Sequence, residues 1–593
     1  MRGYRVYKPV ADASAWSGYR FVSDGTPLWV ASAPAADSRN LFTVLPDGTQ
    51  VALSTANAGV LAAHMNLSAA DAASVITLVR SLPIGAPVSS TPAIFNPPSL
   101  DPPPDADYAA FMEDNKNRRS LIFVGTNRGI LEAIDTRSGV EVWGFIPYNL
   151  LAKLKTLRDG QSVGSFDYFV DSSPKIADVN VGGWKTYLFF GQGAGGTFYQ
   201  ALDVTLAGIS SSVAPDADNV SGLLAYFSTA GRIPFKWSFP SYTSFDPTIS
   251  TTLMPYGDVS ITASALAKSV GQTWSDPAIG QIVAPGSPYV ALVGSGFLPA
   301  TVENQANRGG AAAGTTFYML KVSDGSVLGS KDVGDDNKGE SVDNCATAGD
   351  CTKIKNALQS DPLAAGPQGS RFISDVYIGD LDGRIWRLDL LLGTGDVPNF
   401  TGSPVKLYDD ALSQPIFNSM AEIDVGSTLR YLFVGTGSDL LSSAGVSQQY
   451  KLLGVLDQGN SGSVAFTRLL TKVDGIGDDE KVTAYPAVAG DVVFFTTTTF
   501  RPAALCSLPD ANLYALTFIG GAAYDNTGDN KVTSADTPKV VTIAGVRATA
   551  PFVVDQHLVF GTGTNLQLFG DAQDFNNGVG QAGVRILSWR EVR

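Results

Sequence analysis

The segment LIFVGTNRGILEAID (Leu121–Asp135) contains the pattern that decides the fold. A short apolar strand ends in glycine, and a second strand with an aromatic or acidic residue follows it. Short strands of this kind that break at Gly, Asp or Asn are typical of antiparallel hairpins. Six later segments repeat the pattern, and they begin at Tyr187, Tyr289, Val376, Tyr431, Val492 and Leu558. The sequence therefore contains seven related units.

Repeats of this length and composition predict an all-β fold, a seven-bladed, quinoprotein-like β-propeller with loop and short helical insertions. A four-stranded blade cannot bury both of its faces alone, whereas blades packed around an axis do so. The unequal spacing of the units indicates loop insertions between blade strands. We expect residues 1–593 to form one propeller domain, with blade repeats at about 121–593 and lead-in strands with a helical insertion at 1–120.

Two helical stretches interrupt the pattern. Ser68 and Asp71 resemble a capping box, and the residues that follow place four apolar side chains on one helix face: Ala72, Val75, Ile76 and Val79. Asn149 is expected to cap a second helix, whose apolar stripe consists of Leu150, Leu151, Leu154 and Leu157.

Three stretches are predicted to lack regular structure. Repeated prolines in Ser89–Asp107 remove strand hydrogen-bond donors and indicate a loop. Asp216–Asn219 and Asp332–Gly366 are expected to be exposed insertions.

The composition excludes several classes of function. The chain has 62 Gly and 33 Pro among 593 residues, which indicates many tight turns and few long helices. Its formal charge of −15 argues against nucleic-acid binding, since Lys and Arg provide most of the affinity for phosphates. Only two histidines, His64 and His557, are present, so zinc sites with several His ligands are excluded and most acid–base schemes lack their usual group.

The cysteines and the chain ends bear on the cellular compartment. Cys345 and Cys351 lie close together in a polar stretch, which is compatible with a small disulfide-closed loop, while Cys506 stands alone. Three unpaired thiols are the alternative. No run of about 20 apolar residues suggests a transmembrane segment. The first 20 residues lack the apolar centre of a signal peptide, so we expect a fragment or a mature portion if the protein is secreted.

A glycine motif follows the strand YLFF. Gly191, Gly193 and Gly196 have the GxGxxG spacing of dinucleotide-binding sites. That site requires a helix after the glycines, because the amides of the helix N-terminus bind the pyrophosphate. The residues that follow, TFYQALDV (Thr197–Val204), have strand composition. A glycine-rich hairpin is therefore the predicted structure.

The segment DNTGDNKVTSAD (Asp525–Asp536) has the spacing of an EF-hand loop. Ca²⁺ prefers six to eight oxygen ligands, which such a loop supplies from alternating positions. The predicted ligands at positions one, three, five, seven, nine and twelve are Asp525, Thr527, Asp529, the carbonyl of Lys531, Thr533 and Asp536. The loop resembles that of dockerin modules. Asn530 occupies the position usually held by Gly, and Asn tolerates a positive φ better than most residues.

Two other acidic stretches carry weaker signals. Asp332, Asp336, Glu340 and Asp343 repeat part of the EF-hand spacing, but Gly334 provides no side-chain ligand, so a solvated acidic loop is expected. Asp380, Asp382 and Gly383 fit a hairpin turn. No nucleophile and base pair stands out as a catalytic set.

Long ordered motifs resemble the C-terminal propeller domain of the PilY family of type IV pilus biogenesis and tip-associated adhesion factors. These motifs are Phe123–Pro147, Tyr168–Thr205, Thr273–Ile282, VYIGDLDGRIWRLDL from Val376, and the terminal SWREV. KPVADASAWSGYRF and RNLFT also look like the family's lead-in to the first blade. The chain departs from the family at Arg128 and Glu132, where Asp and His are frequent, and its acidic loop is less compact. A von Willebrand-like domain is frequent in the family, but no DxSxS metal-site motif occurs here, so we do not expect that domain within these residues.

The resemblance implies a non-enzymatic protein outside the Gram-negative cell, at the pilus tip. It implies a complex with minor pilins that promotes pilus assembly, twitching motility and surface adhesion, in which Ca²⁺ influences extension versus retraction. One alternative is a quinoprotein dehydrogenase that holds a quinone and Ca²⁺. The blade strands of such enzymes have a GxLxAxD-type pattern, which occurs here as Gly129, Leu131, Ala133 and Asp135, but the vicinal Cys pair of many such enzymes is lacking. The second alternative is a free-standing surface- or glycan-binding propeller.

Overall fold

The structure is a computed structural model, and it is built mostly from short antiparallel strands. It describes residues 1–3, 6–11, 19–23, 27–98, 105–159, 167–209, 219–229, 231–248, 270–282, 286–296, 314–334, 356–367, 370–410, 412, 414–425, 429–437, 449–471, 480–500, 508–529, 531–554, 557–562 and 565–571. None of the helices in these ranges combines the length and hydrophobicity needed to cross a bilayer.

Six sheets follow one another along the chain, here named sheets I to VI. Sheet I contains β7 (Ala93–Phe95), β8 (Leu121–Gly125), β9 (Leu131–Asp135) and β10 (Glu141–Phe145), extended by β5 (Leu41–Val44) and β6 (Gln50–Ala52). Sheet II contains β11 (Lys175–Asn180), β12 (Trp184–Phe190), β13 (Tyr199–Asp203) and β14 (Phe235–Phe239). Sheet III contains β15 (Ala278–Gln281), β16 (Tyr289–Gly294), β17 (Thr316–Lys321) and β18 (Val327–Asp332).

The second half of the chain forms the next three sheets. Sheet IV contains β19 (Leu363–Ala365), β20 (Asp375–Gly379), β21 (Arg384–Leu392) and β22 (Pro398–Asp409). Sheet V contains β23 (Ala421–Val425), β24 (Leu429–Gly435), β25 (Lys451–Asp457) and β26 (Gly462–Leu469). Sheet VI contains β27 (Glu480–Val482), β28 (Ala487–Ala489), β29 (Val492–Thr499), β30 (Asp510–Thr517) and β31 (Lys539–Ile543).

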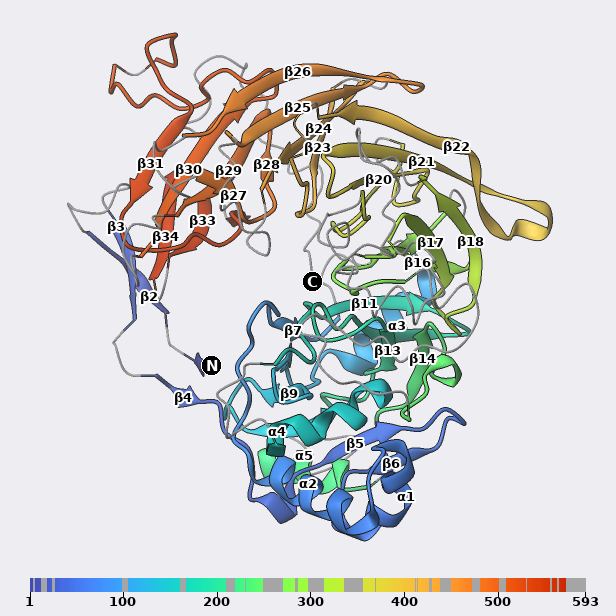
Figure 1. Cartoon of the computed structure of the whole chain (residues 1–593). Coiled ribbons are helices and arrows are strands. Elements are labelled where there is room, and N and C mark those ends of the chain that lie inside the picture. Colours follow the sequence, from blue (N-terminus) through green and yellow to red (C-terminus); the bar gives the residue numbers. More distant parts are fainter. Residues whose placement is uncertain are drawn as a thin grey trace.

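Sheet VII joins the two ends of the chain. It combines β2 (Val6–Ala11) and β3 (Tyr19–Ser23) with β32 (Phe552–Val554), β33 (His557–Thr562) and β34 (Asn565–Asp571). The N-terminal hairpin pairs with the C-terminal strands through β3 and β34. Figure 1 shows the sheets in a curved succession that brings β2 and β3 next to the last strands. A small pair, β1 (Arg2–Gly3) with β4 (Trp29–Val30), completes the strands.

The sequence repeat matches the observed strands. Each of the seven predicted units places its described residues on two neighbouring strands of one sheet: β8 with β9, β12 with β13, β16 with β17, β20 with β21, β24 with β25, β29 with β30, and β33 with β34. The last part of the seventh unit, 584–592, lies outside the described residues. The predicted β class is therefore confirmed, and four-stranded sheets recur along the chain. The closed seven-bladed ring stays a prediction.

Glycines at the ends of these strands touch the segment that leads into the next sheet. A Cβ atom on Gly125, Gly191 or Gly294 would lie 2.4, 2.0 or 2.2 Å from the carbonyl oxygens of Val170, Thr273 and Leu358, respectively. On Gly379 or Gly435 it would lie 2.2 or 2.1 Å from a side-chain carbon of Ile416 or Val482. Because real Cβ atoms do not approach this closely, only glycine permits these contacts between consecutive sheets.

A second repeated feature holds three of these strand ends and the end of β33. A Ser or Thr two residues before a proline accepts the backbone N–H of the strand-end glycine. The pairs are Ser90 with Gly125 (3.0 Å), Ser275 with Gly294 (3.4 Å), Ser360 with Gly379 (2.9 Å) and Thr549 with Gly561 (2.8 Å). The hydroxyl satisfies an N–H group at the point where the ladder ends.

Tryptophan side chains make a third kind of contact between elements. Trp237 of β14 donates its indole N–H to the carbonyl of Val322 (2.7 Å) and covers the turn at Gly325 after β17. Trp29 of β4 does the same at Thr136 (2.8 Å) and Gly139, after β9. In both cases the glycine has a positive φ and lies three residues after the accepting carbonyl.

The helices are short insertions. They are α1 (Ala58–His64), α2 (Ala69–Ser81), α3 (Ala106–Asn115), α4 (Lys155–Asp159) and α5 (Val220–Phe227). The 3₁₀ turns are η1 (Ala36–Ser38), η2 (Thr55–Asn57), η3 (Tyr148–Leu150), η4 (Ala152–Leu154), η6 (Tyr242–Ser244) and η8 (Thr394–Asp396). The first predicted helix is confirmed as α2: the hydroxyl of Ser68 accepts the N–H of Asp71, and all four predicted apolar residues are buried.

Three local predictions need correction. Asn149 is wrong as a helix cap, because it lies inside η3 and its buried amide bonds Gln192 instead; the four leucines are nevertheless buried. The proline-rich stretch is not all loop: β7 lies within it, and α3 begins at Ala106. The stretch 332–366 includes the end of β18 and all of β19 (Leu363–Ala365), where pairing with β20 provides the ladder bonds.

A buried ionic cluster attaches α2 to sheet I. Arg39 donates to both carboxylate oxygens of Glu141 on β10 (3.0 and 2.5 Å). Its remaining nitrogen donates to three carbonyls at the end of α2, those of Val79, Arg80 and Leu82. Glu132 on β9 is fully buried and lies 3.9 Å from the same guanidinium. One cation therefore faces two buried carboxyl groups.

We predict that Gly294→Ala destabilises the protein by about 1–3 kcal/mol, because the added methyl collides with the carbonyl of Leu358. Chemical denaturation measures the change. Gly59→Ala is the control: Gly59 lies in α1 with open space around it, and alanine there stabilises a helix by about 0.5–1 kcal/mol. Equal effects of the two substitutions would contradict the contact between sheets III and IV.

We predict that Glu132 makes the protein less stable as the pH rises. Burial raises the pKa of Glu132 well above its usual range, and the Glu141 carboxylate raises it further. The folded state therefore keeps a proton that the unfolded chain releases above about pH 4. Stability falls by about 1.4 kcal/mol per pH unit from there up to the raised pKa. Glu132→Gln should remove this slope in denaturation curves at pH 5–9. Glu113→Gln, at an exposed glutamate, should retain it; identical slopes in both variants would refute the assignment.

Candidate functional site

The predicted calcium loop connects β30 to β31 at the edge of sheet VI. Backbone bonds hold both of its ends on β30: the N–H of Ala523 donates to the carbonyl of Ala515 (3.2 Å), and the N–H of Ala515 donates to the carbonyl of Pro538 (2.9 Å). The loop therefore projects from a fixed base.

Asp536 organises the loop. Its carboxylate accepts the backbone N–H groups of Asn526 (3.0 Å), Thr527 (3.0 Å) and Thr533 (2.7 Å). The bond from Thr533, with those from Thr527 and Asn526, lowers the pKa of Asp536, since all three stabilise the charged form. The last predicted ligand is thus an ionised group that draws the two halves of the loop together.

The other predicted ligands are brought together only in part. Asp525 accepts the N–H groups of Thr527 (3.1 Å) and Gly528 (2.7 Å), so the carboxylates of Asp525 and Asp536 meet at the amide of Thr527. Asp529 instead accepts the N–H of Lys531 (2.9 Å), in a separate turn. In the ranges that the structure describes, no three Asp, Glu, His or Cys side chains form a group suited to a metal ion. Calcium binding stays a prediction.

The glycine motif forms a hairpin, as the strand composition predicts. Gly191, Gly193 and Gly196 lie between β12 and β13, so a strand follows the motif where a nucleotide site requires a helix. The side-chain amide of Asn149 in η3 exchanges two hydrogen bonds of 2.8 Å with that of Gln192 in this hairpin. Close packing between sheets explains the glycines.

The predicted turn at Asp380, Asp382 and Gly383 is also confirmed, between β20 and β21. The Asp380 carboxylate accepts the N–H groups of Asp382 (3.0 Å) and Arg384 (2.9 Å) and the indole N–H of Trp386 (2.9 Å). Burial raises the pKa of Asp380 to about 6. This acidic motif is therefore a buried structural turn.

Several predicted residues lie outside the described part of the chain. They are Cys345, Cys351, Cys506, Asp336, Glu340, Asp343 and Asn530. Asp332, at the end of β18, accepts the N–H of Gly334 (2.9 Å).

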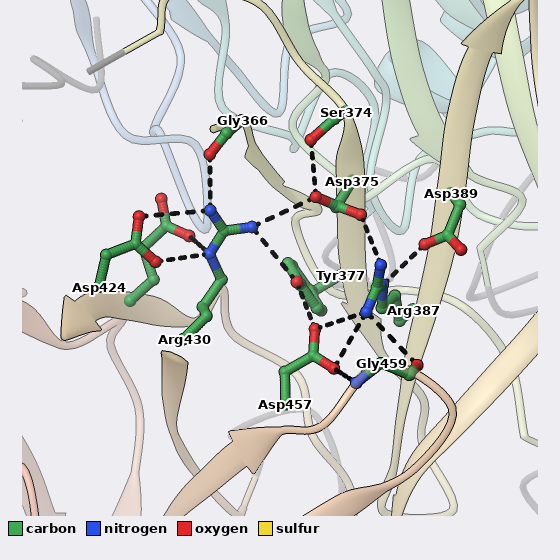
Figure 2. A network of polar contacts seen from close by, with 11 residues as sticks. Gly366, Ser374, Asp375, Tyr377, Arg387, Asp389, Asp424, Arg430, Asp457 and Gly459 are labelled. Carbon is green, nitrogen blue, oxygen red and sulfur yellow. Dashed lines mark hydrogen bonds and ion pairs between the residues drawn. The ribbon is translucent and has the colours of Figure 1, made fainter. Parts of the chain in front are cut away.

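A polar network that the sequence does not reveal joins sheets IV and V (Figure 2). Arg387 on β21 pairs with Asp375 (2.9 Å), Asp389 (2.7 Å) and Asp457 (3.1 Å). Arg430 on β24 pairs with three carboxylates, those of Glu422 (3.0 Å), Asp424 (2.9 Å) and Asp375 (3.4 Å). The charges on these strands are visible in the sequence, but the two pairs that cross between the sheets, Arg387 with Asp457 and Arg430 with Asp375, are not specified by local patterns.

No family model matches the chain. The chain is 25% identical over 423 residues to the type IV pilus biogenesis factor PilY1 of Pseudomonas aeruginosa (strain UCBPP-PA14), covering 65% of this chain and 30% of that protein. It is 32% identical over 198 residues to a PilY1 homolog of Xylella fastidiosa (strain Temecula1), covering 30% of this chain and 16% of that protein.

Among solved structures, the crystal structure of the Pseudomonas aeruginosa PilY1 C-terminal domain is similar at 18% identity and a TM-score of 0.49, covering 80% of this chain and 96% of that one. The chain thus spans less than a third of the length of the curated relatives named above. The sequence comparisons confirm the resemblance found in the motifs: the chain is a relative of the PilY family of type IV pilus biogenesis factors.

Proposed function

We propose that this chain acts in type IV pilus biogenesis as a non-enzymatic part of a pilus-tip complex with minor pilins. In this role it promotes pilus assembly and extension and supports adhesion to surfaces, outside the cell. The observation that carries the proposal is the sequence similarity over 423 residues to a type IV pilus biogenesis factor. The hairpin and turn explanations of the GxGxxG and Asp-Gly motifs support a scaffold role, because both motifs contribute to packing.

We also propose that sheets I to VII are the seven blades of a closed propeller. Strand-end glycines that touch the lead-in segment of the following sheet support this order. Sheet VII, assembled from both ends of the chain, supports closure. A ring of this kind offers broad rims and loops for docking and requires no catalytic set.

The third part of the proposal concerns Ca²⁺ at residues 525–536. Asp525, Thr527 and Asp536 already lie together, and Thr533 contacts Asp536. Ca²⁺ binding would recruit Asp529 and the Lys531 carbonyl, replacing the turn between them. The ion would order the loop and alter the edge of sheet VI that a partner meets, and so favour extension or retraction.

We predict that deleting the gene in its own organism reduces the number of surface pili, and that the full-length gene restores them. Electron microscopy of pili and a twitching assay measure this. A strain without the gene that keeps normal pili but loses attachment to glycans would support a free-standing binding propeller. Dye-linked alcohol oxidation by the purified protein with added pyrroloquinoline quinone would support the dehydrogenase instead.

We predict that the protein binds Ca²⁺ in calorimetry and that Asp529→Ala abolishes most of the binding heat, because one of three carboxylate ligands is lost. Asp47→Ala is the matched control: this exposed carboxylate also accepts a backbone N–H, from Thr49 (2.8 Å), but lies far along the chain in the turn between β5 and β6. No binding by the unsubstituted protein, or unchanged binding by Asp529→Ala, would exclude the site. Unchanged pili in an Asp525→Ala, Asp529→Ala strain would exclude its regulatory role.

A further inference from the structure

The boundary between sheets IV and V is held by an exchange of arginines. Arg387 of sheet IV donates to both carboxylate oxygens of Asp457 on sheet V (3.1 Å each). Arg430 of sheet V donates in return to the carboxylate of Asp375 (3.4 Å) and the carbonyl of Gly366 (2.6 Å) on the sheet IV side. Figure 2 shows the two guanidinium groups on opposite sides of Asp375. Each sheet therefore contributes one arginine that donates hydrogen bonds to oxygen atoms of the other sheet.

Tyr377 connects the two halves of the exchange. Its hydroxyl donates to Asp457 (2.7 Å) and accepts from Arg430 (3.3 Å). Burial and the hydrogen bond to Asp457 raise the pKa of Tyr377, so the hydroxyl keeps its proton as a donor. Asp375, bound by both arginines, is the second shared member. The contacts thus form one connected network.

The strands fix this geometry from both sides. Arg430 lies directly opposite Asp424 on β23 and Asp457 on β25, while Tyr377 lies opposite Arg387 in the β20–β21 pair. The side chains of Arg430 and Asp457 are only 13% and 6% exposed, so solvent screens these charges weakly. Removing either arginine leaves carboxylates from both sheets with fewer partners in a poorly solvated place.

A further ion pair crosses the same boundary at its other end. Lys451, the first residue of β25, lies 2.7 Å from Asp410, which follows β22, and both are buried. Gln414, between the two sheets, accepts the hydroxyl of Thr436 on the sheet V side (2.9 Å). Ion pairs therefore cross this boundary at both ends of the strands.

We propose that this exchange locks sheets IV and V into one opening unit, so that neither sheet exposes its backbone amides to solvent without the other. Regions of a protein open in cooperative groups, and a shared network of partly buried charges couples the residues that it joins. The proposal concerns the scaffold and does not depend on the pilus function.

Hydrogen exchange measured by mass spectrometry on the full chain tests the lock. Arg430→Ala should speed the slowest exchange by about tenfold in both β20–β21 and β24–β25. Arg387→Ala should speed exchange in both regions by a similar factor. In the double variant, the fold-increase in exchange rate should be smaller than the product of the two single fold-increases, because both arginines belong to the network that Asp375 and Tyr377 connect. Arg158→Ala, which removes two exposed ion pairs at α4, is the control and should leave both regions unchanged.

If Arg430→Ala does not fold, Arg430→Lys replaces it, since lysine keeps the charge but loses the forked contacts. Faster exchange in both sheets supports the lock. Faster exchange in sheet V alone, or no change in either sheet, overturns it, as does a double variant whose effect equals the product of the single effects.

Discussion

The close contact between a strand-end glycine and the backbone of the next sheet is the constraint on which the rest of the structure depends. Gly125, Gly191 and Gly294 each leave room for a carbonyl that would lie within 2.4 Å of a Cβ atom. A side chain at any of these positions would push consecutive sheets apart and expose apolar strands. The Ser or Thr that accepts the glycine N–H then satisfies the one donor that this crowding would isolate. Sheet order, spacing and hydrogen bonding thus meet at one position in three repeats, at Gly125, Gly294 and Gly379.

The distance along the chain between interacting residues explains which features the sequence could predict. The central hairpins were identified because their apolar residues, glycines and acidic residues are adjacent in the chain, and α2 because a helix cap and an apolar face are local patterns. β7 was missed because prolines near it indicate a loop, although Pro92 directly precedes the strand and costs no ladder bond. The pairing of β3 with β34 joins opposite ends of the chain, and no local pattern specifies it.

In the candidate site, too, the sequence predicts contacts between neighbouring residues and misses contacts between distant ones. The spacing of Asp525, Thr527 and Asp536 correctly indicated residues that meet in the loop, since turns at such spacings are local. It did not indicate that the carboxylates already accept backbone N–H groups, nor that Asp529 caps a separate turn. The sequence does not predict the arginine network, because Asp375 and Arg430 come together only where two sheets pack side by side.

The surplus of acidic residues affects the interior of the protein as well as its net charge. Arg39, Arg387 and Arg430 are each surrounded by more carboxylates than one cation neutralises. At Arg39, burial raises the pKa of Glu132 well above its usual range, so we expect a proton on this carboxyl to offset the surplus. At Arg387 and Arg430 the exposure of the carboxylates is uneven: Asp389 is 38% and Glu422 is 25% exposed, whereas Asp457 is only 6% exposed. The same excess of acid therefore produces a pH-dependent cluster in one place and a charge-linked boundary in another.

The position of the acidic loop limits how far a change within it can travel. Its ends are bonded to β30, and Lys539, the first residue of β31, lies 3.0 Å from Glu480 on β27 and 3.3 Å from the hydroxyl of Thr471 beyond β26. Lys539 therefore connects the base of the loop to a fully buried carboxylate in sheet VI and to the end of sheet V. A change in this loop that moved Lys539 would act on the ion pair with Glu480 and on the contact with Thr471, so the loop is linked to the interior of sheet VI as well as to its edge.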